Sequence, residues 1–155
     1  RFHPYLPCMP KDITFKRVSI YVHPHIYKVL RRDYGYKDCL RLSRRYHLYM
    51  HRDTLHPAKS LVPDEEKKKI HIEAPDINHR KAYAIIRNIE EQFRQRMNLY
   101  VLAKTQAGVP SRAALREFIE LYDILEEELK LDSCYKDWSR FKAKEGKRSP
   151  IPLWI

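Results

Sequence analysis

Residues 15–34, FKRVSIYVHPHIYKVLRRDY, contain the change of period that decides the fold. Over residues 14–22 apolar and polar side chains alternate, which predicts a half-buried strand. Val18, Ile20 and Val22 share one side of this strand, and Arg17, Ser19 and Tyr21 share the other. Pro24 follows at once and suits the first turn of a helix. The segment therefore predicts a strand that leads directly into a helix.

The predicted helix after Pro24 has one apolar face and a defined end. Ile26, Val29 and Leu30 have helical spacing, and Gly35 stands where a glycine commonly ends a helix. After a short loop, Ser43 suits the N-cap of a second helix over residues 43–55. Four arginines surround the apolar stripe of that second helix: Arg41, Arg44, Arg45 and Arg52.

The rest of the chain predicts one more strand and several helices. Alternation over residues 69–74 predicts a short second strand, and a long apolar stripe predicts a helix over residues 77–107, capped by Asp76. Further helices are expected from Ser111, from Asp123 in a capping box with Glu126, and after Asp132. The fold class is thus an α-rich α+β protein with a two-stranded element and five or six helices.

Composition divides the chain into four predicted regions. Residues 1–13 hold three prolines and form an N-terminal arm, and residues 14–60 form a basic strand-helix-helix region. Residues 61–144 form a helical bundle region with the long helix, and residues 145–155 form a basic tail with an apolar tip.

The positive charge is concentrated at one end of the sequence. The net charge is +11, and residues 1–60 hold 13 Lys/Arg against 4 Asp/Glu. Residues 111–132 are instead acidic, with 3 basic and 7 acidic side chains. Such an asymmetry is typical of a protein with an anionic partner. It favours a nucleic acid, with DNA preferred to RNA.

Several function classes are disfavoured by composition. The chain has only three glycines, too few for a phosphate loop or a dinucleotide fold. Three widely spaced cysteines, Cys8, Cys39 and Cys134, indicate free thiols in a reducing compartment. No apolar run approaches 18 residues, so no membrane partner is expected. We expect no cofactor, no metal and no enzymatic activity, and a location in the cytoplasm, a nucleoid or a virion.

The order strand, helix, basic helix over residues 15–55 resembles the ribbon-helix-helix family of DNA-binding proteins. The resemblance implies that the outward side of the strand, Arg17, Ser19 and Tyr21, reads bases. It implies that the start of the second helix, Ser43, Arg44 and Arg45, holds phosphate. The loop GYKDCLRLS departs from the family, which also pairs its strand between two subunits, whereas a strand at 69–74 offers a partner within this chain.

The candidate nucleic-acid contacts extend beyond these two sets. Arg31 and Arg32 of the first helix, with Arg41 and Arg52, complete the predicted basic surface. Seven of the 11 tyrosines fall in residues 1–50 among the arginines, an arrangement that suits base stacking. Tyr21 and Tyr36 are the tyrosines expected to be open to a ligand.

The resulting hypothesis is a nucleic-acid-binding accessory protein, a regulator or architectural component of a phage or mobile element. One alternative is an assembly subunit, a homo-oligomer or part of a larger complex, that uses its proline-rich arms. A second alternative rests on His23 and His25, which resemble the paired histidines of metal-dependent single-strand nickases. Proline between them departs from that family, because it breaks a central strand.

Overall fold

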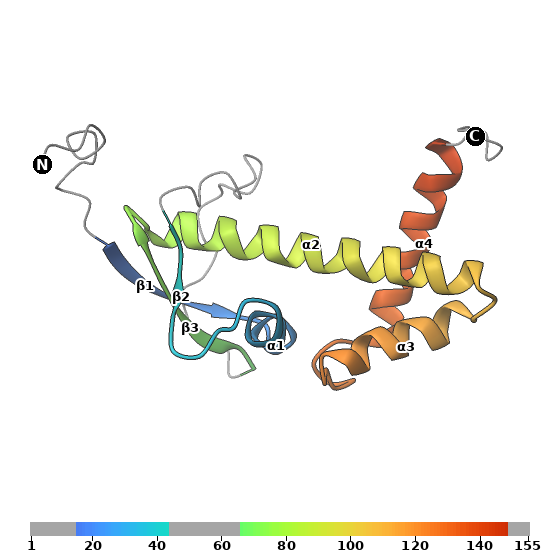
Figure 1. The fold of residues 1–155 in the computed structure, drawn as a ribbon, viewed down its shortest axis with the longest axis horizontal. Helices are drawn as coiled ribbons and strands as arrows, with labels where there is room; N and C mark the ends of the chain where they lie inside the picture. Colours follow the sequence, from blue (N-terminus) through green and yellow to red (C-terminus); the bar gives the residue numbers. More distant parts are fainter. Residues whose placement is uncertain (1–14, 44–65, 149–155) are drawn as a thin grey trace, which may run out of the picture. The chain divides into compact units, whose positions relative to one another are not determined.

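The computed structural model describes residues 15–43 and 66–148. In chain order the elements are β1 (Phe15–Val22), α1 (Pro24–Asp33), β2 (Leu40–Arg41), β3 (Lys68–Pro75), α2 (His79–Gln106), α3 (Ser111–Leu121) and α4 (Leu131–Arg148) (Figure 1). They belong to two compact units. The described residues of the first unit are 15–22, 36–43 and 66–88, and those of the second are 23–35 and 89–148.

A three-stranded sheet organises the first unit, in the order β1-β3-β2. β1 and β3 are antiparallel over their full length, from Phe15 opposite Pro75 to Val22 opposite Lys68. β2 is parallel to β3, with Leu40 opposite Ile72. The pairing of the two predicted strands within one chain is therefore confirmed.

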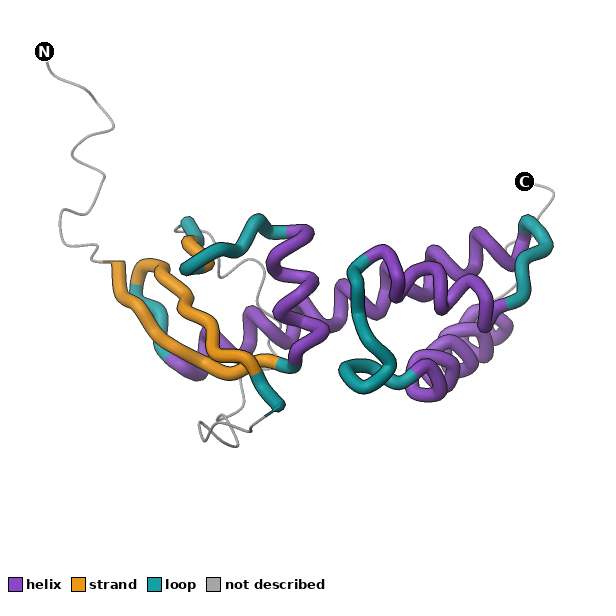
Figure 2. Tube along the Cα trace, turned by 90° about the horizontal axis from the view of Figure 1, so that it is seen from below, coloured by secondary structure: helices purple, strands orange, loops and turns teal. Residues whose placement is uncertain are grey.

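The alternating pattern of the strands separates a buried face from an open face. Ile20 and Val22 of β1 and Ile70 and Ile72 of β3 are at most 3% exposed, whereas the residues between them face outward. The start of α2, residues 79–88, belongs to the same unit and contributes Ala82, Ala84, Ile85 and Ile86 to the core. Figure 2 shows the strands of this unit together with the first turns of the helix.

The third strand, β2, was not predicted from the sequence. It has only two residues, too few to show a period. Its pairing continues at Leu42, whose backbone N–H donates to the carbonyl of Glu73 at 2.9 Å. The helix predicted over residues 43–55 lies, from residue 44 onward, outside the described residues.

Aromatic rings fill the core of the second unit. Phe93 of α2 is 2% exposed, and its ring centroid lies 5.5 Å from that of Phe118 and 5.3 Å from that of Tyr122. α3 and α4 pack beside each other through their apolar sides, where Leu115 and Trp138 are buried. Within the described ranges no helix is long and apolar enough to cross a lipid bilayer.

The predicted α-rich α+β class is confirmed, but the element count differs. The described residues form four helices and three strands instead of five or six helices and two strands. Asp123 and Glu126 do not restart a helix: Asp123 has a left-handed backbone (φ 54°), and Glu126 accepts the N–H of Leu131 at 3.2 Å. The segment between α3 and α4 is therefore a series of turns.

The expected cap of the long helix is also corrected. Asp76 lies before the helix with φ 55°, in the left-handed region that aspartate tolerates better than most residues. Asn78 provides the cap instead, because its Oδ1 accepts the backbone N–H of Lys81 at 2.8 Å. The prediction of Gly35 as the end of α1 agrees with the structure, where its φ is 63°.

Candidate nucleic-acid interface

The outward face of the sheet in the first unit collects side chains from all three strands. The antiparallel register places Arg17 beside Glu73, Ser19 beside His71, and Tyr21 beside Lys69. The parallel register places Arg41 on the other side of Glu73. We call this surface the open sheet face; its members are Phe15, Arg17, Ser19, Tyr21, Arg41, Lys69, His71 and Glu73.

Glu73 joins two arginines across the strands. Arg17 Nη1 lies 3.4 Å from its Oε2, and Arg41 Nη2 lies 2.8 Å from its Oε1. The hydrogen bond from Arg41 is the main cause that lowers the pKa of Glu73, so this carboxylate is charged at neutral pH. The two arginine side chains remain 51% and 75% exposed, so both guanidinium groups are still accessible to an anion.

A polar contact holds the middle of the open sheet face. Ser19 Oγ and His71 Nδ1 lie 2.7 Å apart across β1 and β3. On the other edge of β3, the backbone N–H of His71 donates to the hydroxyl of Tyr36 at 3.1 Å. Tyr36 is only 5% exposed, so it supports the sheet, and the expectation that it is open to a ligand is wrong.

Aromatic rings lie at both ends of β1 on this face. Phe15 is 53% exposed, and the guanidinium carbon of Arg41 lies 5.9 Å from its ring centroid. Tyr21 is half-buried, and within the described part of the chain no hydrogen bond or ring contact involves it. The open sheet face therefore combines one exposed ring, Phe15, and one half-buried ring, Tyr21, with cations.

The first unit is basic as a whole. Its described residues hold ten Lys/Arg and four Asp/Glu. The run Lys67, Lys68 and Lys69 at the start of β3 accounts for three of these cations, and Lys68 and Lys69 are exposed.

The predicted contact residues divide between several places. Arg17, Ser19, Tyr21 and Arg41 lie together on the open sheet face. Ser43 is exposed just beyond β2. Arg31 and Arg32 belong to the other unit, where they lie over the rings of Tyr27 and Tyr122 at 6.0 and 5.5 Å. Arg44, Arg45 and Arg52 lie outside the described residues.

Four members of the face were absent from the predicted set: Phe15, Lys69, His71 and Glu73. Alternation over residues 69–74 contained the signal for the last three, because Ile70 and Ile72 define the opposite side of the same strand. The register with β1, which brings them beside Arg17 and Tyr21, has no local signal in the sequence.

The histidine pair lies at the start of α1 in the second unit. His23 is the N-cap residue, and the rings of His23 and His25 are stacked at 5.7 Å with an interplanar angle of 11°. Burial, and then the neighbouring His23, lower the pKa of His25 to about 4. No group of three or more histidine, cysteine or acidic side chains suited to a metal ion occurs among the residues described.

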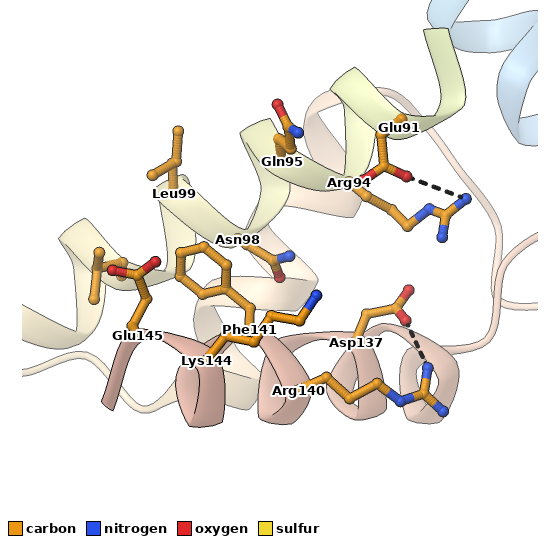
Figure 3. Close-up of a pocket in the computed structure, with 11 residues that line it drawn as sticks. Glu91, Arg94, Gln95, Asn98, Leu99, Asp137, Arg140, Phe141, Lys144 and Glu145 are labelled. Carbon is orange, nitrogen blue, oxygen red and sulfur yellow. Dashed lines mark hydrogen bonds and ion pairs between the residues drawn. The ribbon is translucent and has the colours of Figure 1, made fainter. Parts of the chain in front are cut away.

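A groove between α2 and α4 is a second candidate surface, in the second unit (Figure 3). Its volume is about 540 Å³, and Leu99 on its wall is 56% exposed. Asn98 is 8% exposed, and its Oδ1 has no hydrogen-bond partner among the described residues. Three acidic and three basic side chains line the groove: Glu91, Asp137 and Glu145, with Arg94, Arg140 and Lys144. This balance of charge gives the groove no preference for a polyanion.

Comparison with known proteins gives no relative for this chain. No protein-family model, no curated protein and no solved structure matches it.

Proposed function

We propose that this protein is a nucleic-acid-binding accessory protein, a regulator or architectural component without enzymatic activity. The observation that carries the proposal is the open sheet face, where Arg17 and Arg41 flank the carboxylate of Glu73 and Lys69 lies further along β3, beside Tyr21. Phe15, Arg17, Arg41 and Lys69 on this face are exposed, the unit that contains the face is basic, and three strands hold its side chains in one layer.

The chemistry of these cations suits phosphate. An arginine guanidinium presents its N–H groups as a planar fork, which matches two phosphate oxygens at once. Glu73 holds Arg17 and Arg41 by hydrogen bonds, so less side-chain freedom is lost when they meet a ligand. Binding dominated by such contacts releases counterions, and its affinity therefore falls steeply with salt.

The ribbon-helix-helix resemblance also supports a nucleic acid as the partner, but the strand pairing differs from that of the family. In that family the strand pairs with its counterpart in a second subunit, whereas β1 here pairs with β3 of its own chain. The resemblance stays an interpretation of residues 15–55, of which 44–55 lie outside the described residues. The proposal consequently rests on the sheet face and not on the family.

The proposal predicts how salt affects binding. We expect the purified protein to bind nucleic acid at low salt, and the triple substitution Arg17→Ala/Arg41→Ala/Lys69→Ala to weaken binding to every sequence. The slope of log affinity against log salt should become shallower by about 2 to 3, because each lost phosphate contact contributes about 0.7 to 0.9. Fluorescence anisotropy over a salt series, with duplex DNA, a single strand and a structured RNA, measures both effects.

A matched control removes cations from the acidic part of the other unit. Arg116→Ala/Lys130→Ala changes two exposed cations, and we expect its salt slope to stay close to that of the unchanged protein. If the salt slope of the control became as shallow as that of the triple variant, binding would depend on the net charge of the protein and not on the open sheet face. No binding to any of the three ligands at low salt would contradict the proposed function.

The groove between α2 and α4 favours a second candidate function, that of an assembly subunit. Its equal numbers of acidic and basic side chains leave the groove without net charge, so a second copy of this chain can meet it across a two-fold axis without charge repulsion. In that case Leu99→Glu, which places a charge on the exposed apolar wall, should convert a dimer to a monomer in light-scattering measurements of mass. Gln106→Glu, an exposed position on the same helix outside the groove, serves as control, and a monomeric unchanged protein would contradict this alternative.

A further inference from the structure

The open sheet face carries more than a cationic surface, because its cations alternate with rings. Along β1 the outward side chains are, in order, Phe15, Arg17, Ser19 and Tyr21. On β3 the imidazole of His71 lies beside Ser19, and Lys69 lies beside Tyr21. The six residue steps from Phe15 to Tyr21 extend about 20 Å along the strand.

The two rings of β1 on this face differ in exposure, since Phe15 is exposed and Tyr21 is half-buried. Phe15 is 53% exposed at the end of an edge strand, although burial would stabilise so large an apolar ring. No ring contact of Tyr21 occurs within the described ranges, and its neighbour across the strands is a lysine. The contact of His71 with Ser19 at 2.7 Å holds the imidazole on the same face.

We infer that the open sheet face binds a single-stranded nucleic acid, whose bases stack on Phe15 and Tyr21 while Arg17, Arg41 and Lys69 hold its phosphates. This inference rests on the proposed function and names its ligand class. In a duplex the faces of the bases are already stacked on one another, so exposed rings gain nothing from them. Unstacked bases of a single strand can lie on aromatic side chains next to cations.

Arg41 adds a second contact at one end of the face. Its guanidinium lies 5.9 Å from the centroid of the Phe15 ring and also donates to Glu73. A base stacked on Phe15 therefore lies beside a cation that is held in place. This arrangement suits any base, because every base has a π face, and it predicts weak sequence preference.

The inference is tested with three ligands of equal length. They are a fluorescent twelve-nucleotide oligothymidylate, an abasic oligomer with the same number of phosphates, and a twelve-base-pair duplex. We expect the oligothymidylate to bind at least about tenfold more tightly than the abasic strand, because stacking acts on each base. An oligouridylate of the same length shows whether RNA or DNA is preferred.

Substitutions separate stacking from charge. Phe15→Ala and Tyr21→Ala should each weaken binding of the oligothymidylate about tenfold and leave the abasic strand unaffected. Tyr21→Phe, which keeps the ring, should bind like the unchanged protein. Tyr34→Ala removes a 38% exposed ring from the other unit and serves as control. Circular dichroism shows that each variant is folded before its binding is compared.

The outcomes distinguish this inference from the proposed function. Equal affinity for the base-bearing and abasic strands, or tighter binding of the duplex, would overturn stacking while phosphate binding stands. Failure to bind any ligand would overturn both.

Discussion

Replacement of Phe93 by alanine is expected to lower the free energy of unfolding of the second unit by about 3 to 5 kcal/mol, the usual cost of removing a buried phenylalanine ring. The ring is 2% exposed and contacts Phe118, Tyr122 and His25, with centroids 5.5, 5.3 and 6.1 Å away. These contacts join α2, α3 and the start of α1, so the cavity left by alanine cannot be closed by one side chain.

The measurement is urea unfolding followed by the fluorescence of Trp138, which is buried in α4 of the same unit. Trp154→Phe provides a background with one tryptophan. Gln106→Ala on the same helix is the control; this side chain is exposed and outside the groove, and its loss should change stability by no more than about 0.5 kcal/mol. Equal losses for the two substitutions would contradict the assignment of Phe93 to the core.

A fall in stability on acidification is the second large expected effect. Burial is the main cause that lowers the pKa of His25 from 6.5 to about 4, and the stacked His23 adds to it. The unfolded chain therefore takes up a proton near pH 6.5, before the folded chain does. The contribution of His25 to stability should be level above pH 6.5, decrease by up to about 3 kcal/mol as the pH falls to 4, and change no further below that pH.

Other charged groups lie close to His25 and also affect how stability depends on pH. Lys28 Nζ donates to Glu128 Oε1 at 2.5 Å, and Arg94 also acts on the imidazole. Burial raises the pKa of Glu128, but the hydrogen bond from Lys28 and the N–H of Leu125 outweigh it, so the net shift is downward. The stability that ionised Glu128 contributes is therefore lost only as the pH falls below the ordinary glutamate pKa of 4.5, when most of the effect of His25 is already complete.

His25→Gln isolates the contribution of the imidazole. In a series of urea unfolding curves between pH 7.5 and 4, this variant should lose most of the dependence on pH that the unchanged protein shows between pH 6.5 and 4. His79→Gln removes an exposed histidine from the first unit and serves as control. The same flattening in both variants would show that burial of His25 is not the cause.

Much of the secondary structure could be predicted because its causes are local. Alternation over residues 14–22 predicted β1, and the long apolar stripe after Asp76 predicted α2 to within two residues at each end. The same alternation placed Arg17, Ser19 and Tyr21 on one side of β1, because successive side chains of a strand point to opposite faces. Three of the eight members of the open sheet face could thus be predicted from the sequence of one strand.

The turns between α3 and α4 could not be predicted from local sequence patterns. Asp123 and Glu126 have the spacing of a capping box, yet Glu126 accepts the N–H of Leu131 and Glu128 accepts that of Leu125. Because two glutamates in this short segment can each accept a backbone N–H, the local sequence does not show which hydrogen bond forms. The ion pair of Glu128 with Lys28, 100 residues away in the chain, contributes to the choice of turns over a new helix.

The sequence by itself therefore determined the positions of β1, β3, α1 and α2 and which side of β1 is polar, because these depend on periods of two to four residues. The tertiary structure decided which residues meet. It placed Glu73 between Arg17 and Arg41, which lie 56 and 32 residues from it in the chain, and it buried Tyr36 behind His71. Strand register is chosen by packing of the whole buried face, and no short segment contains that information.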